Sequence, residues 1–315
     1  MATVFALEFS SSNHSFLVGN RLRGTIPEEL GALKMLTSLE LRNNLLSGTF
    51  PSKFFLDVHG LEALDVSENN LSSSSILDEI GYSVMAITLK SIKLGGNQFS
   101  GTIPLRMDNV KNLVEFNISH NTFEGNILDG LDRIQGLSGL SYLKNLDVLD
   151  VSYCDFTGGM YRGLISRLFN SSALTTFRID GNSFTGPLPN ELGSLHALSF
   201  LSLSRNKFAG TVPDTLGQMT GLKELDMSGN RLAGSLPTTF GNLTALKVLD
   251  VSNNRIIGNI PTELGSCASL EELLLDNNNL GGTVPSTLSE LPSLGKFKFC
   301  LSSLKQRATI PMLCV

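Results

Sequence analysis

The chain has 315 residues, and its 24 lysines and arginines against 29 aspartates and glutamates give a formal net charge of -5. Charged residues make up only 17% of the sequence and hydrophobic residues 41%. This balance excludes the strongly basic surface that nucleic-acid binding requires, and it is too hydrophobic for a disordered protein. Leucine fills 55 positions and asparagine 25, a bias that indicates an internal repeat.

The beginning of the chain does not have the form of a signal peptide. The first basic residue is Arg21, and the apolar stretch from Met1 to Phe9 is short and contains Glu8. No run of 18 apolar residues occurs, so we expect no membrane-spanning segment. Two interpretations stay open, an intracellular protein and a piece of a longer secreted or membrane protein.

One motif, Leu-x-x-Leu-x-Leu-x-x-Asn/Cys-x-Leu, recurs along the whole chain. Its Asn/Cys position is filled in order by Asn20, Asn44, Asn69, Asn97, Asn121, Cys154, Asn182, Asn206, Asn230, Asn254 and Asn278. The steps are 24, 25, 28, 24, 33 and 28 residues and then 24 four times, and a further step reaches a degenerate copy at Ser302. We therefore predict an α/β fold: a right-handed leucine-rich repeat solenoid of about 11 repeats over residues 1–302, followed by a tail or incomplete cap at 303–315.

Each part of the motif has a physical role. Leu-x-Leu has the period of a β-strand, with its leucines inward and x outward, so stacked repeats form a parallel concave sheet. The Asn amide can satisfy buried backbone groups where the chain turns, whereas Cys154 is only a weak donor. Glycine follows four residues later in every repeat except at Ser73, and proline follows seven residues later in eight repeats. Short segments such as ELGSL then predict an irregular or 3-10 convex side that depends on stacking.

The longer repeats lie within residues 69–182. Extra residues fall at Ser72–Ser75, Asp129–Lys144 and Gly159–Ala173. Such insertions form either loops on a binding face or longer convex helices, and we favour a helix for a segment such as Leu131–Leu140.

The phrase Leu-x-Gly-x-Ile/Val/Leu-Pro, followed by x-x-Leu/Phe-Gly-x-Leu, resembles plant-type leucine-rich repeats over residues 15–302. This subclass forms ectodomains of plant receptor-like kinases and receptor-like proteins, and polygalacturonase-inhibiting proteins. The resemblance implies non-catalytic recognition of a peptide or protein at the cell surface, in signalling or defence, with a co-receptor as a further partner. An inhibitor of a secreted cell-wall hydrolase and an intracellular scaffold remain alternatives. The chain departs from the family in its caps, because no tryptophan occurs and no cysteine precedes Cys154.

The outward positions of the concave strands are the candidate binding surface. Aromatic and arginine side chains are enriched where binding energy concentrates, and they gather in the middle repeats. The candidate ligand contacts are His120, Tyr153, Arg178, Asp180, Phe200 and Arg205. The sequence has no catalytic or metal-binding motif, so we expect no catalytic residue, no metal and no cofactor.

Whether the cysteines form disulfides and the sequons carry glycans depends on the compartment of the protein. Cys154 and Cys267 lie several repeats apart, too far for a bridge between strands stacked about 4.8 Å apart, and should be free. Cys300 and Cys314 flank the last remnant and can form a capping disulfide in an oxidising compartment. If the protein is secreted, glycans can attach at the sequons that begin at Asn13, Asn70, Asn117, Asn170 and Asn242. A glycan on Asn117 would obstruct the concave face.

Overall fold

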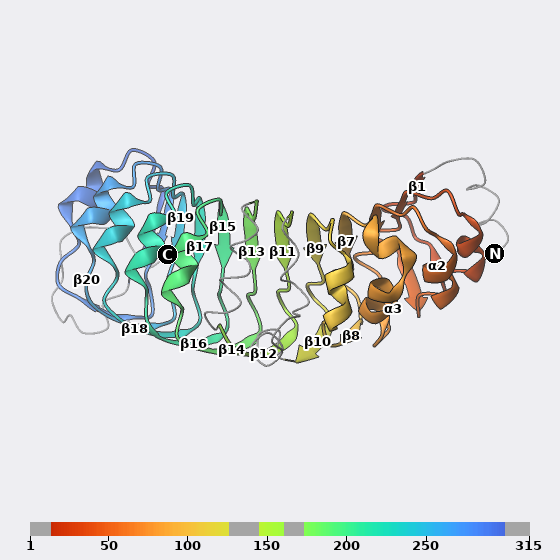
Figure 1. The fold of residues 1–315 in the computed structure, drawn as a ribbon. Coiled ribbons are helices and arrows are strands. Elements are labelled where there is room, and N and C mark those ends of the chain that lie inside the picture. Colours follow the sequence, from red (N-terminus) through yellow and green to blue (C-terminus); the bar gives the residue numbers. More distant parts are fainter. Residues whose placement is uncertain (1–13, 126–144, 161–172, 300–315) are drawn as a thin grey trace. The chain divides into compact units, whose positions relative to one another are not determined.

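The computed structural model describes residues 14–125, 145–160 and 173–299. The chain divides into two compact units, residues 1–157 and 158–315, which we call unit 1 and unit 2 and describe separately. In both units the same coil recurs: a main-sheet strand, a turn, a second short strand and a helical turn (Figure 1). The predicted leucine-rich solenoid is confirmed.

The main sheet of each unit is parallel, with strands in chain order. In unit 1 it contains β1 (His14–Phe16), β3 (Ser38–Glu40), β5 (Ala63–Asp65), β7 (Ser91–Lys93), β9 (Glu115–Asn117) and β11 (Val148–Asp150). In unit 2 it contains β13 (Thr176–Arg178), β15 (Phe200–Ser202), β17 (Glu224–Asp226), β19 (Val248–Asp250), β21 (Glu272–Leu274) and β23 (Lys296–Lys298). The repeat period appears in the register, because Leu201 pairs with Leu225 and Leu225 with Leu249. These leucines are buried, as the alternating pattern predicts.

The asparagine after each strand ties its repeat to the preceding one. In unit 2, Asn206 is buried and donates through Nδ2 to the carbonyl oxygens of Leu203 at 3.2 Å and Ser204 at 3.0 Å. It also donates to Ile179 O of the preceding repeat at 2.9 Å, while its Oδ1 accepts the Phe184 N–H at 3.0 Å. One amide thus satisfies several buried backbone groups that would otherwise destabilise the turn.

Cys154 fills the asparagine position of its repeat, as predicted, with fewer bonds. Its Sγ lies 3.4 Å from Ile118 O and 3.6 Å from Ser152 O, at the positions of two asparagine contacts. Burial raises the pKa of the Cys154 thiol to about 11, although the backbone of Asn121 and of Phe123 partly opposes the shift. Cys267, at the end of a convex turn, is buried as well, and both thiols are free as expected.

Second strands follow the asparagine and form shorter parallel sheets. In unit 1, β2 (Arg23–Gly24), β4 (Leu45–Gly48) and β6 (Asn70–Leu71) pair in order, and β8 (Ser100–Gly101) pairs with β10 (Thr122–Gly125), which pairs with β12 (Asp155–Gly159). In unit 2 the order is β14 (Ser183–Gly186), β16 (Lys207–Thr211), β18 (Arg231–Gly234), β20 (Arg255–Asn259) and β22 (Asn279–Gly281). The repeat glycine turns the chain here with a positive φ, for example 86° at Gly210.

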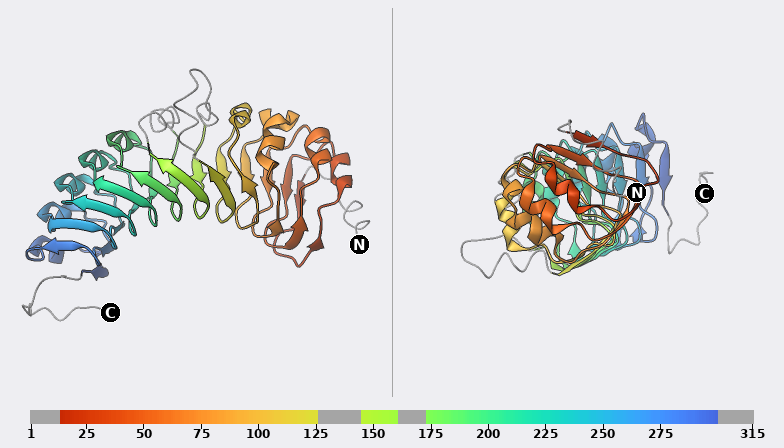
Figure 2. Two further views of the ribbon diagram at one scale, coloured as in Figure 1. Left: turned by 90° about the horizontal axis from the view of Figure 1, so that it is seen from below. Right: turned by 90° about the vertical axis from the view of Figure 1, so that its right-hand side faces the viewer.

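In the repeats whose closing segments the structure describes, helical turns lie on the side away from the main sheet (Figure 2). Unit 1 has η1 (Glu28–Ala32), α2 (Ser52–Asp57), α3 (Ile76–Tyr82), η2 (Val84–Ile87) and η3 (Leu105–Asn109). Unit 2 has η4 (Asn190–Ser194), η5 (Asp214–Gln218), η6 (Thr238–Asn242), η7 (Thr262–Ser266) and η8 (Ser286–Glu290). The repeat proline immediately precedes each of the unit 2 turns, where its fixed φ suits a helix start.

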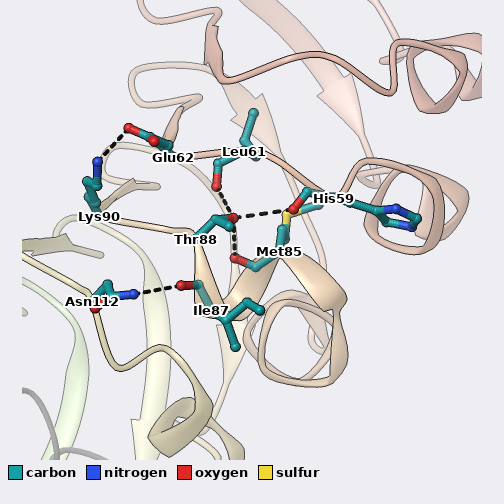
Figure 3. A network of polar contacts seen from close by, with 8 residues as sticks. All are labelled: His59, Leu61, Glu62, Met85, Ile87, Thr88, Lys90 and Asn112. Atoms are coloured by element: carbon teal, nitrogen blue, oxygen red, sulfur yellow. Dashed lines mark hydrogen bonds and ion pairs between the residues drawn. The ribbon is translucent and has the colours of Figure 1, made fainter.

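The extra residues of the third repeat form a helix. After the Ser72–Ser75 segment, α3 and η2 replace the single short turn of the regular repeats. Figure 3 shows the contacts that attach the segment between η2 and β7 to the preceding repeat. Thr88 Oγ1 donates to Leu61 O at 2.7 Å, and Lys90 Nζ forms an ion pair with Glu62 at 2.7 Å. The insertions at 129–144 and most of 159–173, including the helix favoured at Leu131–Leu140, lie outside the described residues.

Candidate ligand-binding face

The residue before the repeat Asn/Cys adopts a left-handed backbone conformation throughout the described repeats. We call these positions the rim column, because each lies three residues after the end of a main-sheet strand, at the edge of the main-sheet face. The column holds Gly19, Asn43, Glu68, Gly96, His120 and Tyr153 in unit 1, and Gly181, Arg205, Gly229, Asn253 and Asn277 in unit 2. A positive φ at this point turns the chain so that the next side chain enters the core.

Four side chains of the rim column are unusual for that conformation. Glycine tolerates a positive φ freely and asparagine at small cost, whereas other residues cost about 1–2 kcal/mol. Glu68, His120, Tyr153 and Arg205 nevertheless adopt φ values of 50–56°. Glycine or asparagine would suit this backbone better, so the backbone conformation does not account for these four residue types.

In unit 1, His120 and Tyr153 form a stacked pair. Their ring centroids are 4.5 Å apart and their planes differ by 9°. Both side chains are exposed, and the exposed fraction of Tyr153 is 36%. The backbone N–H of His120 donates to Ser152 O at 2.9 Å. The sheet backbone therefore holds a flat aromatic surface in place at the ends of β9 and β11.

Glu68 lies in the same rim column as His120 and Tyr153, although it was not among the candidate contacts chosen from the sequence. Its carboxylate lies over Gly96, since a Cβ at Gly96 would come within 2.7 Å of Glu68 Oε1. Gly96 separates Glu68 from His120 in the rim column, so a carboxylate and an aromatic pair lie along one edge of unit 1. A non-glycine, non-asparagine residue before the repeat asparagine is the signal that would have found it.

In unit 2, three of the four predicted residues are accessible on the main-sheet face. Arg178 at the end of β13 and Arg205 in the rim column are exposed, and Phe200 on β15 is half-buried. Arg205 leans over Gly229, because its Cγ would lie 3.5 Å from a Cβ there. Asp180 is only 9% exposed, since it occupies the inward-leaning position that serine holds in neighbouring repeats. It therefore offers a ligand little surface.

Carboxylates line the following strands of unit 2. Burial raises the pKa of the Asp250 carboxyl, and the charges of Asp226 and Asp276 raise it further, against hydrogen bonds from Ser252. Asp250 Oδ1 accepts the Ser252 N–H at 2.9 Å, and Asp226 accepts from Ser228 in the same way. Asp226 and Asp250 are the last residues of β17 and β19, and their carboxylates give this part of the main-sheet face an acidic character.

The remaining predicted sites are only partly visible. Cys300 and Cys314, Asn13 and Asn170 lie outside the described residues. Asn70 and Asn242 are exposed, whereas Asn117 is half-buried and its Oδ1 accepts both the N–H and the hydroxyl of Ser119.

The fold and the repeat motif together define a leucine-rich repeat protein. Residues 131–311, more than half of the chain, match the family model of a leucine-rich repeat region, and the chain belongs to this family. It is 30% identical over 201 residues to the receptor-like kinase TMK2 of Arabidopsis thaliana, covering 58% of this chain and 22% of the relative. It is 36% identical over 158 residues to receptor-like protein 41 of the same plant, covering 50% and 16%. The chain thus spans about a fifth of the length of these relatives.

Solved structures of plant receptors share the architecture. A TDR receptor superposes with a TM-score of 0.73 at 28% identity, covering 90% of this chain and 50% of that one. The plant peptide hormone receptor RGFR1, solved in complex with RGF2, gives a TM-score of 0.67 at 27% identity with the same coverage. Across the described residues, no helix has both the length and the apolar character needed to cross a membrane.

Proposed function

We propose that this chain is the ligand-recognition part of a plant receptor-like protein or kinase and binds a peptide or protein at the cell surface. The contacts lie on the main-sheet faces: His120 and Tyr153 in unit 1, and Arg178, Phe200 and Arg205 in unit 2. The relatives named above are a receptor-like kinase and a receptor-like protein, and the plant peptide hormone receptor RGFR1 was solved in complex with RGF2.

One observation carries the choice of residues. His120, Tyr153 and Arg205 are exposed side chains on backbone that favours glycine or asparagine. A rigid aromatic surface binds a ligand at low entropic cost, and an arginine can grip a carboxylate with two hydrogen bonds. These residues therefore combine a folding cost with the properties of a binding surface.

The test separates binding from folding. A ligand is first identified by display of secreted plant peptides, and its affinity is then measured for Tyr153→Asn, His120→Asn and Arg205→Asn. Asparagine keeps the positive φ, so we expect folding to be unharmed while each true contact costs about 2 kcal/mol of binding, roughly 30-fold in Kd.

His196→Ala is the matched control, because His196 is exposed just after η4 on the side away from the main sheet. Its affinity should equal that of the wild type. Normal binding by all three rim variants, with loss in His196→Ala, would transfer the ligand site to the convex side.

A further inference from the structure

The second sheet of unit 2 carries a row of cations that the proposed ligand contacts do not include. Lys207, Arg231 and Arg255 begin β16, β18 and β20, and all three are exposed. We call them the basic row. The strands β14, β16, β18, β20 and β22 contain no aspartate or glutamate.

Within the part of the chain that the structure describes, the two arginines of the basic row are unpaired. Among the described residues, neither Arg231 nor Arg255 makes an ion pair or a side-chain hydrogen bond, and Lys207 reaches only the hydroxyl of Ser183, at 3.2 Å. By contrast, Lys247, also exposed in unit 2, pairs with Glu271 at 2.7 Å. The row thus retains its full positive charge toward solvent.

The surroundings of the basic row leave it open to a partner. The register places Arg231 beside Ala209 and Arg255 beside Ala233, so only a methyl group flanks each guanidinium stem on the preceding strand. Ile257, two residues after Arg255 and on the same face, is 51% exposed. Small and apolar neighbours allow another chain to approach the sheet closely.

The register also fixes the spacing of the charges. Each step along the basic row crosses one strand and advances two residues, which places successive side chains roughly 8 Å apart. In an extended peptide, alternate side chains lie on one face roughly 7 Å apart. Flexible lysine and arginine side chains absorb that difference, so alternating carboxylates can meet all three cations.

We infer that the basic row is a second interaction surface, which binds an extended acidic segment of a partner protein with aspartate or glutamate at alternate positions. The charges of unit 2 favour binding of an acidic segment at the second sheet rather than at the main sheet, because Asp226 and Asp250 on the main sheet repel its carboxylates. The planar guanidinium group of arginine can donate two parallel hydrogen bonds to one carboxylate. The inference is independent of the ligand proposed for the main-sheet faces.

The test uses the whole chain and a labelled synthetic peptide of alternating glutamate and threonine. A permuted peptide with the same composition but adjacent glutamates tests the spacing, and an oligouronic acid of equal charge tests generic polyanion binding. Affinities are compared for the wild type, for the double variant Arg231→Gln/Arg255→Gln and for the control Lys223→Gln/Lys247→Gln. The control removes the same charge from exposed lysines that precede β17 and β19.

We expect the alternating peptide to bind best, its affinity to fall with salt, and the arginine variant to weaken it roughly tenfold while the control does not. Unchanged thermal midpoints show that both variants fold. The inference is overturned if the peptide does not bind, if the permuted peptide or the oligouronic acid binds equally well, or if the control loses as much affinity.

Discussion

A single amide side chain decides how well one repeat is joined to the next. Asn206 donates to three carbonyl oxygens and accepts one N–H, whereas Cys154 contacts two carbonyl oxygens with a weak donor. The repeat that contains Cys154 is therefore joined to the preceding repeat by fewer and weaker hydrogen bonds than a repeat with asparagine at this position.

Restoring the amide should stabilise unit 1. We expect Cys154→Asn to raise the free energy of unfolding by about 1 kcal/mol, the net contribution of a typical hydrogen bond, measured by urea unfolding. Cys267→Asn is the contrasting control, because Cys267 is buried and its Sγ hydrogen-bonds, among the described residues, only Phe240 O at 3.2 Å. It should lower stability by about 1–3 kcal/mol. A loss of stability in Cys154→Asn would show that the site cannot hold the amide.

The buried thiols predict an alkaline limit to stability. Burial raises the pKa of both Cys154 and Cys267 from 9.0 to about 11. Below pH 9 both folded and unfolded thiols are protonated, so nothing changes. Between pH 9 and 11 only the unfolded chain loses these protons, and the free energy of unfolding falls by as much as about 1.4 kcal/mol per pH unit for each thiol.

Urea midpoints measured from pH 8 to 11 check this, with Cys154→Ala/Cys267→Ala for comparison. The double variant starts less stable but should lose less stability over the same interval, since it lacks the two buried thiols and every other ionisable group is common to both proteins. Parallel pH profiles would contradict the prediction.

At the scale of the element, the short convex turns are stable because they stack closely. A Cβ on Gly217 of η5 would come within 2.4 Å of Thr239 O in η6, and one on Gly241 of η6 within 2.7 Å of Glu263 O in η7. Turns this short do not persist alone in water, so this close approach holds the convex side of unit 2 together.

Adding one methyl group should separate two of these turns. Gly217→Ala forces backbone of η5 and η6 apart, and we expect a loss of about 3 kcal/mol in the free energy of unfolding. Gly221→Ala is the matched control, because the nearest atom to its Cβ is His196 O at 3.8 Å. It should fall within about 0.5 kcal/mol of the wild type. Equal stability of the two variants would mean that the turns separate without cost.

Regular elements were predictable because each is fixed by the repeat. The Leu-x-Leu strands, the asparagine contacts and the turns after proline all follow from one motif. The helix α3 settles an alternative that the sequence left open, because the extra residues at Ser72–Ser75 were compatible with a loop or with a longer convex helix. Burial of Asp180 was missed because its position was judged by residue type rather than by the serines at equivalent positions. The left-handed backbone at Glu68 was missed because the position before the repeat asparagine was not compared between repeats.

At the scale of the whole molecule, each strand is stabilised by its neighbours in the sheet. Among the described strands, β23 pairs only with β21, whereas β17 and β19 have partners on both sides. Phe297 of β23 is half-buried and stacks on Phe299 with centroids 6.1 Å apart, while the equivalent Leu225 and Leu249 are fully buried.

Hydrogen exchange should reflect this difference. We expect amides of β23 to exchange much faster than those of β17 and β19 in the 315-residue chain, because local opening at the end of a sheet exposes little apolar surface. Mass spectrometry of peptic fragments provides the measurement, with β17 as the internal reference. Equal protection in a strict monomer would require a cover over Phe297 that the described residues do not provide.

The contacts between repeats of unit 2 also have a genetic consequence. Asn206, Asn230, Asn254 and Asn278 each donate to a carbonyl 27 positions earlier, always the equivalent atom of the preceding repeat. Each junction therefore has the same chemistry as the next. An unequal crossover that removes residues 207–230 would bring Asn206 directly before Arg231 and recreate a junction the protein already contains. In this stretch, recombination can lengthen or shorten the coding sequence by whole repeats without first inventing a new interface.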